Sequence, residues 1–136
     1  MKEFAFLTSP RIADSELNEL FSSAWDAHAD TDFSYLGTHS LGYICAYDED
    51  LLIGFINIAW NGNRHAFLLD TTVRKEYQKR GLGKALVRRA LALAKSNHVE
   101  WVHVDFEPQH ERFYRSCGFT ACPAGLINLN DNEHSR

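Results

Sequence analysis

The hydrophobic positions along this chain follow two different repeats. Apolar residues at every second position, or in short runs bounded by turn residues, predict extended strands. Apolar residues spaced three and four apart predict helices that bury one face. These patterns predict strands at 2–8, 41–47, 51–60, 65–73 and 99–106 and a last strand or hairpin at 119–130. They also predict a first helix capped by Asp14 or Ser15 and helices at about 81–96 and at 109–117.

The order of these segments predicts a sheet with helices packed on it. Turn residues at Asp48-Glu49-Asp50 and Asn61-Gly62-Asn63 separate the middle strands, so we expect an antiparallel meander there. Residues 25–40, rich in Asp, His and aromatic side chains, predict a loop or a short helix. The whole order, β-α-β-β-β-α-β-α-β, is typical of the α/β and α+β classes. Because the 136 residues contain no repeat or linker, we expect a single domain over residues 1–136.

Composition and charge argue against several classes of protein. Hydrophobic residues make up 45% of the chain and charged residues 24%, as in an ordinary globular protein. Lys and Arg total 14 against 18 Asp and Glu, and this net charge of −4 argues against nucleic-acid binding through bulk charge. No apolar run approaches the length of a membrane span, and residues 1–7 lack the apolar stretch of a signal peptide. We therefore expect a cytoplasmic protein that does not enter a membrane.

The cysteine and histidine residues predict neither a disulfide framework nor a metal site. Cys45, Cys117 and Cys122 are odd in number and lack framework spacing, which is typical of a reduced, cytoplasmic chain. The seven His residues show no coherent metal-ligand spacing with them. We therefore assign no metal, and we interpret Cys117 as a packing residue.

The junction between the strand at 65–73 and the helix at 81–96 has the pattern of an anion site. Backbone N–H groups are free at a helix start, and Gly81 and Gly83 leave room for a ligand to approach them. The helix dipole and the side chains of Lys79, Arg80 and Lys84 add positive charge. A diphosphate suits such a site. The alternative is a tight strand-to-helix turn with a solvated basic face.

Two familiar phosphate loops do not fit this junction. A P-loop has Ser or Thr after its Gly-Lys pair, but Ala85 follows Gly83-Lys84 here. The dinucleotide-binding fingerprint has a third glycine where Leu86 stands. We therefore expect the diphosphate to belong to another ligand.

Two segments resemble the signatures of the GNAT superfamily of acetyl-CoA-dependent N-acyltransferases. Gln78-Lys79-Arg80-Gly81-Leu82-Gly83 matches its Gln/Arg-x-x-Gly-x-Gly/Ala pyrophosphate motif, and Tyr114-Arg115-Ser116-Cys117-Gly118-Phe119 resembles its second signature, Tyr-x-x-x-Gly-Phe. The resemblance covers residues 1–130 and implies a GNAT-like α/β (α+β) fold. In this fold a central mixed, mostly antiparallel twisted sheet of about six to seven strands is flanked by about four helices. Because many relatives are dimers, a homodimer is one expectation.

The resemblance also implies how acetyl-CoA binds. The cofactor would lie in a cleft where the strand ending near Val73 splays from the strand ending near Phe106. Backbone groups of Thr71, Thr72 and Val73 would pair with the pantetheine arm as an added strand would. The Val73 N–H would polarise the thioester oxygen. The pyrophosphate loop would comprise Gln78, Lys79, Arg80, Gly81, Leu82, Gly83 and Lys84.

For catalysis, the resemblance implies that Tyr114 protonates the departing thiolate of CoA, and the pKa of a phenol suits that step. A core tyrosine is the alternative. We rank Asp70 and Glu107 equally as the base that deprotonates the acceptor ammonium, with Asp105 as a further candidate. Glu107 stands where many relatives carry an Asn that contacts the cofactor, so the chain departs from the family there. Ordinary solvated or N-capping carboxylates are the alternative for both.

We expect the acceptor amine to bind between the loop at 25–40 and the late strands, where relatives build their acceptor pockets. Acidic and aromatic side chains there suit a cationic amine through charge and cation–π contact. The candidates are Asp26, His28, Asp30, Asp32, Phe33 and Tyr35, with Trp60 on a nearby strand. An acidic surface loop with core aromatics is the alternative.

Three functions follow from these patterns. The first is an N-acetyltransferase that moves an acetyl group from acetyl-CoA to a primary amine of a small molecule or a protein. The second is a catalytically inactive CoA-binding sensor or interaction module of the same fold. Tyr114 and the glycine loop (residues 78–84) favour the enzyme, whereas Glu107 and the absence of a clearly placed base leave room for the sensor. The third is a basic-loop RNA partner, and the overall acidity counts against it.

Overall fold

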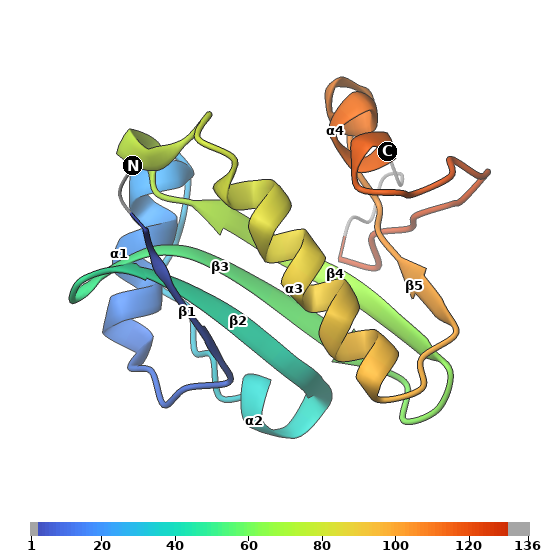
Figure 1. Cartoon of the computed structure of the whole chain (residues 1–136), viewed down its shortest axis with the longest axis horizontal. Helices are drawn as coiled ribbons and strands as arrows, with labels where there is room; N and C mark the ends of the chain where they lie inside the picture. The colour runs from blue at the N-terminus through green and yellow to red at the C-terminus, as the bar shows by residue number, and fades with distance from the viewer. Residues whose placement is uncertain (1–2, 131–136) are drawn as a thin grey trace. The chain divides into compact units, whose positions relative to one another are not determined.

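The computed structural model describes residues 3–130 and divides between Val104 and Asp105 into two compact units. The first unit is a sheet with helices, and the second is a short helical segment followed by irregular chain (Figure 1). The elements of the first unit are β1 (Ala5–Thr8), α1 (Asp14–Ala24), α2 (Leu36–His39), β2 (Ser40–Asp48), β3 (Leu51–Trp60), β4 (His65–Val73), the 3₁₀ turn η1 (Lys75–Tyr77), α3 (Leu82–Ser96) and β5 (Trp101–His103). Those of the second unit are the 3₁₀ turn η2 (Pro108–His110) and α4 (Glu111–Ser116).

The sheet is mixed and mostly antiparallel, as expected. The strand order β1-β2-β3-β4-β5 follows the chain, and only β4 and β5 pair in parallel. Strands β2 to β4 form the predicted meander, and β3 and β4 have the predicted bounds. The four α-helices of residues 3–130 also agree with the expectation. None of them is long and apolar enough to cross a membrane.

The expected number of strands is wrong, because residues 3–130 form five strands rather than six to seven. The segment 119–130, predicted as a last strand or hairpin, contains no strand. Beyond Phe119, its large apolar side chains are at least 58% exposed, so they have no buried face to pack on; they are Leu126, Ile127 and Leu129. The predicted strand at 99–106 is also shorter, because β5 extends only over its pairing with His65–Phe67. Lys2, in the predicted first strand, lies outside the described residues.

Helices α1 and α3 cover opposite faces of the sheet. The ring of Phe21 in α1 lies 5.9 Å from the ring of Phe55 in β3. A Cβ atom at the neighbouring Gly54 would instead lie 3.1 Å from Leu86 of α3. Successive residues of a strand face opposite sides, so the two helices pack on different faces. The α1 face buries a cluster that comprises Leu17, Leu20, Phe21, Phe33, Leu36, Cys45, Leu52 and Phe55.

The apolar stripe of α3 fixes this helix on the other face of the sheet. Its buried residues recur at helical spacing and are Leu82, Leu86, Val87, Ala90 and Ala94. Full burial of one such Leu or Val contributes roughly 1.5–3 kcal/mol. Gly42 of β2 allows a close approach, because a Cβ there would lie 2.8 Å from Leu93. These contacts hold α3 against the sheet along its length.

The predicted cap of the first helix is wrong. Ala13 occupies the N-cap of α1, and no side chain caps the helix. Asp14 is already helical, and its Oδ1 accepts a hydrogen bond from the backbone N–H of Phe33 at 3.4 Å. Neither Asp14 nor Ser15 therefore caps the helix, and the Asp14 carboxylate contacts a segment 19 residues away.

Candidate functional site

Strand β4 carries a bulge at the centre of the candidate site. Between the cross-strand pairs Phe55–Thr72 and Asn57–Leu69, β4 has one residue more than β3. Asp70 lies in this extra stretch and has a φ of +60°. Asp tolerates this left-handed backbone better than most residues, yet the conformation still costs about 1–2 kcal/mol. Such strain persists where surrounding contacts maintain it, and it is frequent at functional sites.

One edge of β4 lacks a strand partner beyond its first residues. Strand β5 pairs with β4 only over His65–Phe67. Within the part of the chain that the structure describes, no other strand continues this pairing along residues 68–73. Unpaired N–H and C=O groups on a strand edge can bind an extended ligand. Thr71, Thr72 and Val73, predicted to pair with the pantetheine arm, lie in this stretch.

Hydrogen bonds tie the bulge to the loop that follows α1. The hydroxyl of Tyr35 donates to Oδ2 of Asp70 at 3.4 Å. The hydroxyl of Thr72, whose residue is only 2% exposed, donates to the Asp70 carbonyl oxygen at 2.9 Å. Nε1 of Trp25 in turn donates to the Thr72 hydroxyl oxygen at 3.2 Å. The sequence patterns did not predict Trp25 as a site residue. The one local signal for it is its position as an aromatic residue directly before the acidic loop.

The Asp70 carboxyl is a weaker acid than an ordinary aspartate. Loss of hydration raises its pKa, although part of the side chain is open to solvent, and the hydrogen bond from Tyr35 offsets some of the rise. The pKa of Tyr35 is raised as well, first by burial and then by the negative charge of Asp70. A carboxylate with a raised pKa is a better proton acceptor near neutral pH. Asp70 therefore has the property that a general base requires.

Asn18 of α1 holds the loop between α1 and α2. Its side-chain Nδ2 donates to the Thr31 carbonyl at 3.0 Å, and its Oδ1 accepts from the Thr31 N–H at 2.9 Å. Nε2 of His28 lies 2.8 Å from the same Oδ1. The predicted residue His28 therefore takes part in holding the loop, which in turn carries Tyr35 to the bulge.

Two of the predicted acceptor residues have structural contacts instead. Phe33 is 4% exposed, and its ring packs edge-on against Phe21 at 5.3 Å between centroids. Asp32 accepts a hydrogen bond from the backbone N–H of Ser34 at 2.8 Å, and this bond lowers the pKa of its carboxyl. Phe33 thus belongs to the core, and Asp32 stabilises the turn that precedes α2.

The other acidic residues of the loop are exposed. Asp26 and Asp30 have no ion pair or hydrogen bond with another residue among 3–130. The structure brings Tyr35 alone of the predicted loop residues into hydrogen-bonding contact with Asp70. Asp26 and Asp30 can attract a cation through charge, but the loop does not hold their side chains in fixed positions.

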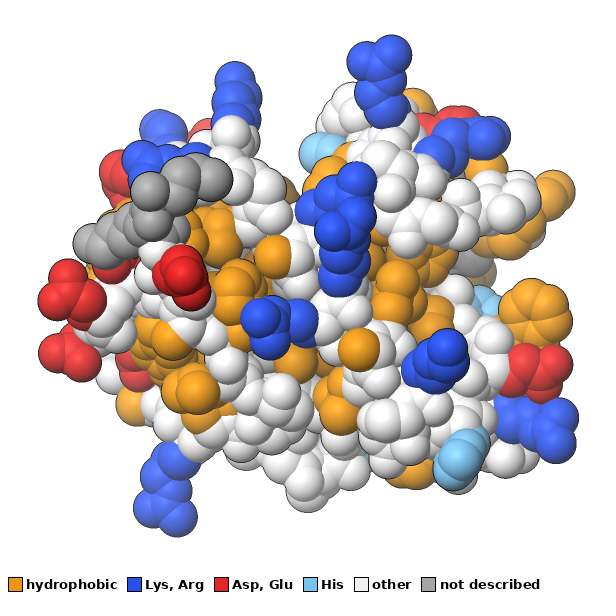
Figure 2. Space-filling view, viewed as in Figure 1, with side chains coloured by type: hydrophobic (Ala, Val, Ile, Leu, Met, Phe, Trp, Pro, Cys, Tyr) orange, Lys and Arg blue, Asp and Glu red, His pale blue; other side chains and the backbone are white. Residues whose placement is uncertain are grey.

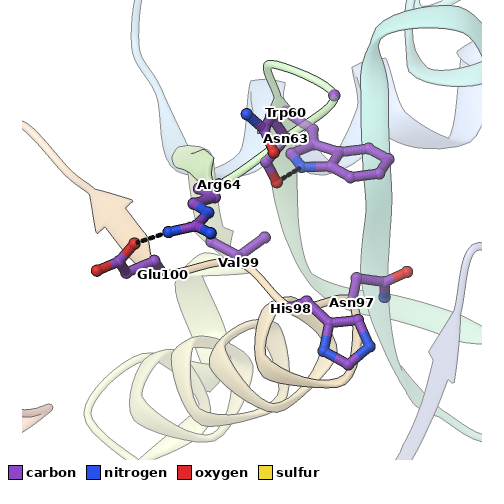
Figure 3. A pocket seen from close by; sticks show the side chains of 8 residues that line it. Trp60, Asn63, Arg64, Asn97, His98, Val99 and Glu100 are labelled. Atoms are coloured by element: carbon purple, nitrogen blue, oxygen red, sulfur yellow. Dashed lines mark hydrogen bonds and ion pairs between the residues drawn. The ribbon is translucent and has the colours of Figure 1, made fainter.

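The structure does not bring Trp60 to the bulge. Trp60 ends β3 and pairs with Ala66, which is four residues before Asp70 and so roughly 13 Å away along the strand. Its Nε1 donates to the Asn63 carbonyl at 2.9 Å (Figure 3). The expectation that Trp60 lies with the loop residues is therefore not met, because the β3–β4 turn holds its ring at the other end of β4.

A shallow cavity of about 600 Å³ lies beside Trp60, between the β3–β4 turn and the loop from α3 to β5. The side chains of Arg64 and Glu100 form an ion pair of 3.1 Å there (Figure 3). Both side chains are more than half exposed, and such pairs contribute at most about 1 kcal/mol. This cavity contains neither the bulge nor the glycine loop.

The glycine loop between η1 and α3 presents its backbone to solvent. Gly81 is the N-cap of α3 with a φ of +84°, and Lys79 also has a positive φ of +64°. No side chain caps the helix, so its first N–H groups have no side-chain acceptor. A Cβ atom at Gly81 would meet nothing within 4 Å. The predicted anion site therefore has the required open backbone.

The side chains of the loop hold its shape. Nε2 of Gln78 donates to the Val73 carbonyl at 3.0 Å and so ties the loop to the end of β4. The Arg80 guanidinium lies 5.0 Å from the centre of the Tyr77 ring and donates to the Glu76 carbonyl at 3.1 Å. The Gln78 side chain therefore already donates to the backbone carbonyl of Val73, one of the residues predicted to pair with the pantetheine arm.

Arg74, directly after β4, is buried and paired. Its residue is 6% exposed, and its two terminal nitrogens donate to both carboxylate oxygens of Glu19 at 2.8 and 2.5 Å. Its Nε donates to the Leu52 carbonyl at 2.9 Å. These hydrogen bonds lower the pKa of the Glu19 carboxyl. Arg74 therefore anchors the end of β4 and is not an exposed cation of the loop.

In the second unit, Tyr114 packs among three aromatic rings. Its residue is 9% exposed, and its ring stacks on Phe106 with 5.0 Å between centroids. Phe113 and Phe119 approach it edge-on at 4.9 and 5.8 Å. These contacts fix the ring of Tyr114 within the unit. They agree with a tyrosine that only packs in the core as well as with a catalytic tyrosine.

Glu107 and Asp105 are exposed residues of the same unit. Glu107 occupies the N-cap of η2, but its carboxylate makes no capping hydrogen bond. Its Oε2 instead accepts from Nε2 of Gln109 at 3.0 Å. The capping alternative for Glu107 is therefore wrong, and its side chain lies on the surface of the unit.

A profile described as "Acetyltransferase (GNAT) family" matches residues 11–119. The chain therefore belongs to the GNAT family of acetyltransferases, as the two motifs predict. Members of this family take their acetyl group from acetyl-CoA, so the expected co-substrate is confirmed at the level of the family.

Three similar proteins illustrate the relationship. Streptothricin acetyltransferase A of Bacillus subtilis (strain 168) is 39% identical over 69 residues, which are 51% of this chain and 40% of that protein. The chain thus spans less than half the length of this relative. A GNAT-family protein of Streptococcus pneumoniae TIGR4 has a TM-score of 0.77 at 23% identity, covering 93% of this chain and 99% of the other. A third, aminoglycoside N-acetyltransferase AAC(6')-Iy in complex with CoA, has a TM-score of 0.73 at 16% identity and covers 93% of both chains. The two structures bear out the GNAT fold.

Proposed function

We propose that this protein is an N-acetyltransferase that moves the acetyl group of acetyl-CoA directly to a primary amine. The observation that carries the proposal is the arrangement of β4, in which a strained bulge at Asp70 and an unpartnered edge at residues 68–73 precede an uncapped glycine loop. A ligand with a thioester, an extended arm and a diphosphate matches these three features in the same order. Membership of the GNAT family supports the same reading.

The donor would bind through backbone groups. The N–H groups at the start of α3 suit the diphosphate, since they are uncapped and Lys79 and Lys84 add positive charge. The free edge of β4 suits the amide groups of the pantetheine arm, which can pair with a strand. Gln78 supports this arrangement by fixing the loop to Val73.

In the reaction, the neutral amine nitrogen attacks the thioester carbonyl carbon, a C–N bond forms and the C–S bond breaks. The amine first loses a proton to a base, and the CoA thiolate gains one from an acid. A backbone N–H of β4, such as that of Val73, would stabilise the oxyanion. The acetylated amine and free CoA leave as products.

We favour Asp70 over Glu107 as the base. Loss of hydration raises the pKa of Asp70, and Tyr35 and Thr72 hold the residue by hydrogen bonds. Glu107 lies exposed on its unit, and its carboxylate accepts a hydrogen bond from the exposed Gln109. We keep Tyr114 as the acid on the strength of its motif, because its ring is fixed and a phenol can donate a proton to a thiolate.

The acceptor would be a cationic amine that binds near Asp70 and Tyr35. The exposed Asp26 and Asp30 support this, since they raise the local concentration of cations. The name of the Bacillus relative makes streptothricin one amine to test. A polyamine, free lysine and a peptide with a free N-terminus cover the other classes.

The proposal is tested by measuring how fast free CoA thiol is released from acetyl-CoA in the presence of each amine of this panel. We expect acetyl-CoA to bind with a micromolar Kd, about −8 kcal/mol, and at least one amine to accelerate thiol release above hydrolysis, with the acetylated amine found by mass spectrometry. Asp70→Asn should bind acetyl-CoA equally and release far less thiol. Binding without release by any amine would instead support a CoA-binding sensor, and no binding of any acyl-CoA would refute both.

A further inference from the structure

The outer face of α3 concentrates positive charge without compensation. The helix carries Lys84, Arg88, Arg89 and Lys95 and has no Asp or Glu, although the whole chain has a net charge of −4. Lys84 and Arg88 are four residues apart, where like charges repel. Lys84 also lies near the positive end of the helix dipole. These repulsions are relieved when an anion binds, so the helix face is suited to one.

A shallow groove follows this face from the glycine loop onward. It has a volume of about 560 Å³. Its lining combines three small residues with three cationic ones: Gly81, Ala85 and Ala92, and Lys84, Arg88 and Arg89. Figure 2 shows Lys and Arg side chains along the face of the molecule that α3 crosses. The groove therefore begins at the proposed diphosphate site and continues down the helix.

The two arginines of the groove differ in their contacts. The Arg89 guanidinium lies over the ring of Phe6, 4.2 Å from its centre, and is held there. Arg88 is exposed and has no hydrogen bond, ion pair or ring contact with another residue among 3–130. Its donors are therefore available to a ligand, and a guanidinium binds a phosphate through two parallel hydrogen bonds.

The position of Arg88 suits a second phosphate group of the same ligand. Arg88 follows Leu82 by six residues, so it lies about 9 Å further along the helix axis. Its side chain leans back towards the helix start. In CoA the 3′-phosphate is joined to the diphosphate through the carbons of one ribose, and this spacing brings it within reach of the Arg88 side chain.

We propose that Arg88 binds the ribose 3′-phosphate of acetyl-CoA and makes the protein prefer CoA to its dephosphorylated form. This rests on the proposed function, since it needs the diphosphate in the glycine loop. Lys84 serves the diphosphate and Arg88 the 3′-phosphate, while Arg89 stays on Phe6. Arg88 is thus a specificity residue for the donor and takes no part in the transfer step.

Titration calorimetry with CoA and with 3′-dephospho-CoA tests this assignment. The wild-type protein should bind CoA about tenfold more tightly, as one charge-assisted contact provides, and added salt should reduce the preference. Arg88→Gln keeps a good helix former at an exposed position. It should lower the affinity for CoA to near that for dephospho-CoA, while leaving the affinity for dephospho-CoA unchanged.

Lys95→Gln is the matched control, because it removes one cation from the same helix outside the groove. It should retain the wild-type preference. Equal binding of the two ligands by the wild-type protein would overturn the inference and leave the proposed function intact, as would a full preference in Arg88→Gln. Failure of both ligands to bind the wild-type protein would refute the proposed function together with this inference.

Discussion

The hydroxyl of Tyr35 donates a hydrogen bond to Oδ2 of Asp70 across 35 positions of sequence. Tyr35 immediately precedes α2, and Asp70 is the left-handed residue of the β4 bulge. The bond therefore joins the loop proposed for the acceptor to the carboxylate proposed as the base. It also couples the ionisation of the two groups, since a hydrogen bond to a carboxylate stabilises its charged form.

Tyr35→Phe removes this hydrogen bond and keeps the aromatic ring. The pKa of Asp70 should rise further, because the bond from Tyr35 at present lowers it. A base acts only when deprotonated, so the acidic limb of the kcat/KM profile should move to higher pH. Tyr43→Phe is the control, because its hydroxyl bonds the Pro10 carbonyl instead. An acidic limb that stays in place in Tyr35→Phe removes Asp70 as the base.

Asp70→Asn should lose activity and yet gain stability relative to the wild type as the pH rises. Folding raises the pKa of Asp70, so between its ordinary value and the raised one the native state binds more protons than the unfolded state. The contribution of Asp70 to stability therefore falls as the pH rises through this window. Asn has no such penalty and also tolerates the φ of +60°.

Urea denaturation at pH 4 and pH 7 measures this difference. The free energy of unfolding of Asp70→Asn, relative to wild type, should be greater at pH 7. Asp70→Ala is the comparison, because it also lacks the carboxyl and should be about 1 kcal/mol less stable than Asp70→Asn at both pH values, since Ala tolerates a positive φ poorly. A difference between Asp70→Asn and wild type that does not change with pH contradicts a raised pKa for Asp70.

Gly81→Ala should weaken acetyl-CoA binding at least tenfold while the fold is retained. A Cβ at residue 81 meets no protein atom within 4 Å, so the direct cost is backbone strain of about 1–2 kcal/mol. The same Cβ would stand where the diphosphate must approach the helix start. Calorimetry with acetyl-CoA and urea denaturation measure the two effects separately.

Gly62→Ala is a matched control for this change. Gly62 has a φ of +82°, close to the +84° of Gly81, and a Cβ there also meets nothing within 4 Å. It lies in the β3–β4 turn, outside the glycine loop. Both variants should lose similar stability, and only Gly81→Ala should lose affinity. Equal acetyl-CoA affinity in the two variants would show that the loop does not bind the diphosphate.

Tyr114→Phe should lower kcat by about 10²–10⁴ and leave the affinity for acetyl-CoA unchanged. The variant retains the ring that stacks on Phe106, so the second unit should keep its packing. What it lacks is the phenolic proton for the departing thiolate. Steady-state kinetics with the best amine, together with calorimetry, provide the measurement. Unchanged turnover would exclude Tyr114 as the acid.

Local patterns predicted most of the elements of the first unit. The apolar run of β3, the turn residues that separate it from β4 and the three-four spacing of α3 are properties of neighbouring residues. The structure has these three elements at the predicted bounds to within one residue. The open start of α3 at Gly81 was predictable as well, because glycine and the change of period are both local signals.

Contacts between distant segments decided the rest. Whether residues 119–130 form a strand depends on a partner, and their exposed apolar side chains have none among the described residues. Trp60 and Phe33 carry the same kind of aromatic signal as Tyr35. The β3–β4 turn holds the first and the core buries the second, so Tyr35 alone of the three contacts Asp70.

The family motifs, the glycine loop and the basic side chains near the start of α3 can be recognised in the amino-acid sequence, because each consists of residues that are close along the chain. Folding was needed to establish which carboxylate lies on a strained bulge and which loop residue bonds to it. The extra residue in β4 is defined by the register with β3, and the raised pKa of Asp70 by loss of hydration. Both are properties of packing between segments, so no local pattern records them.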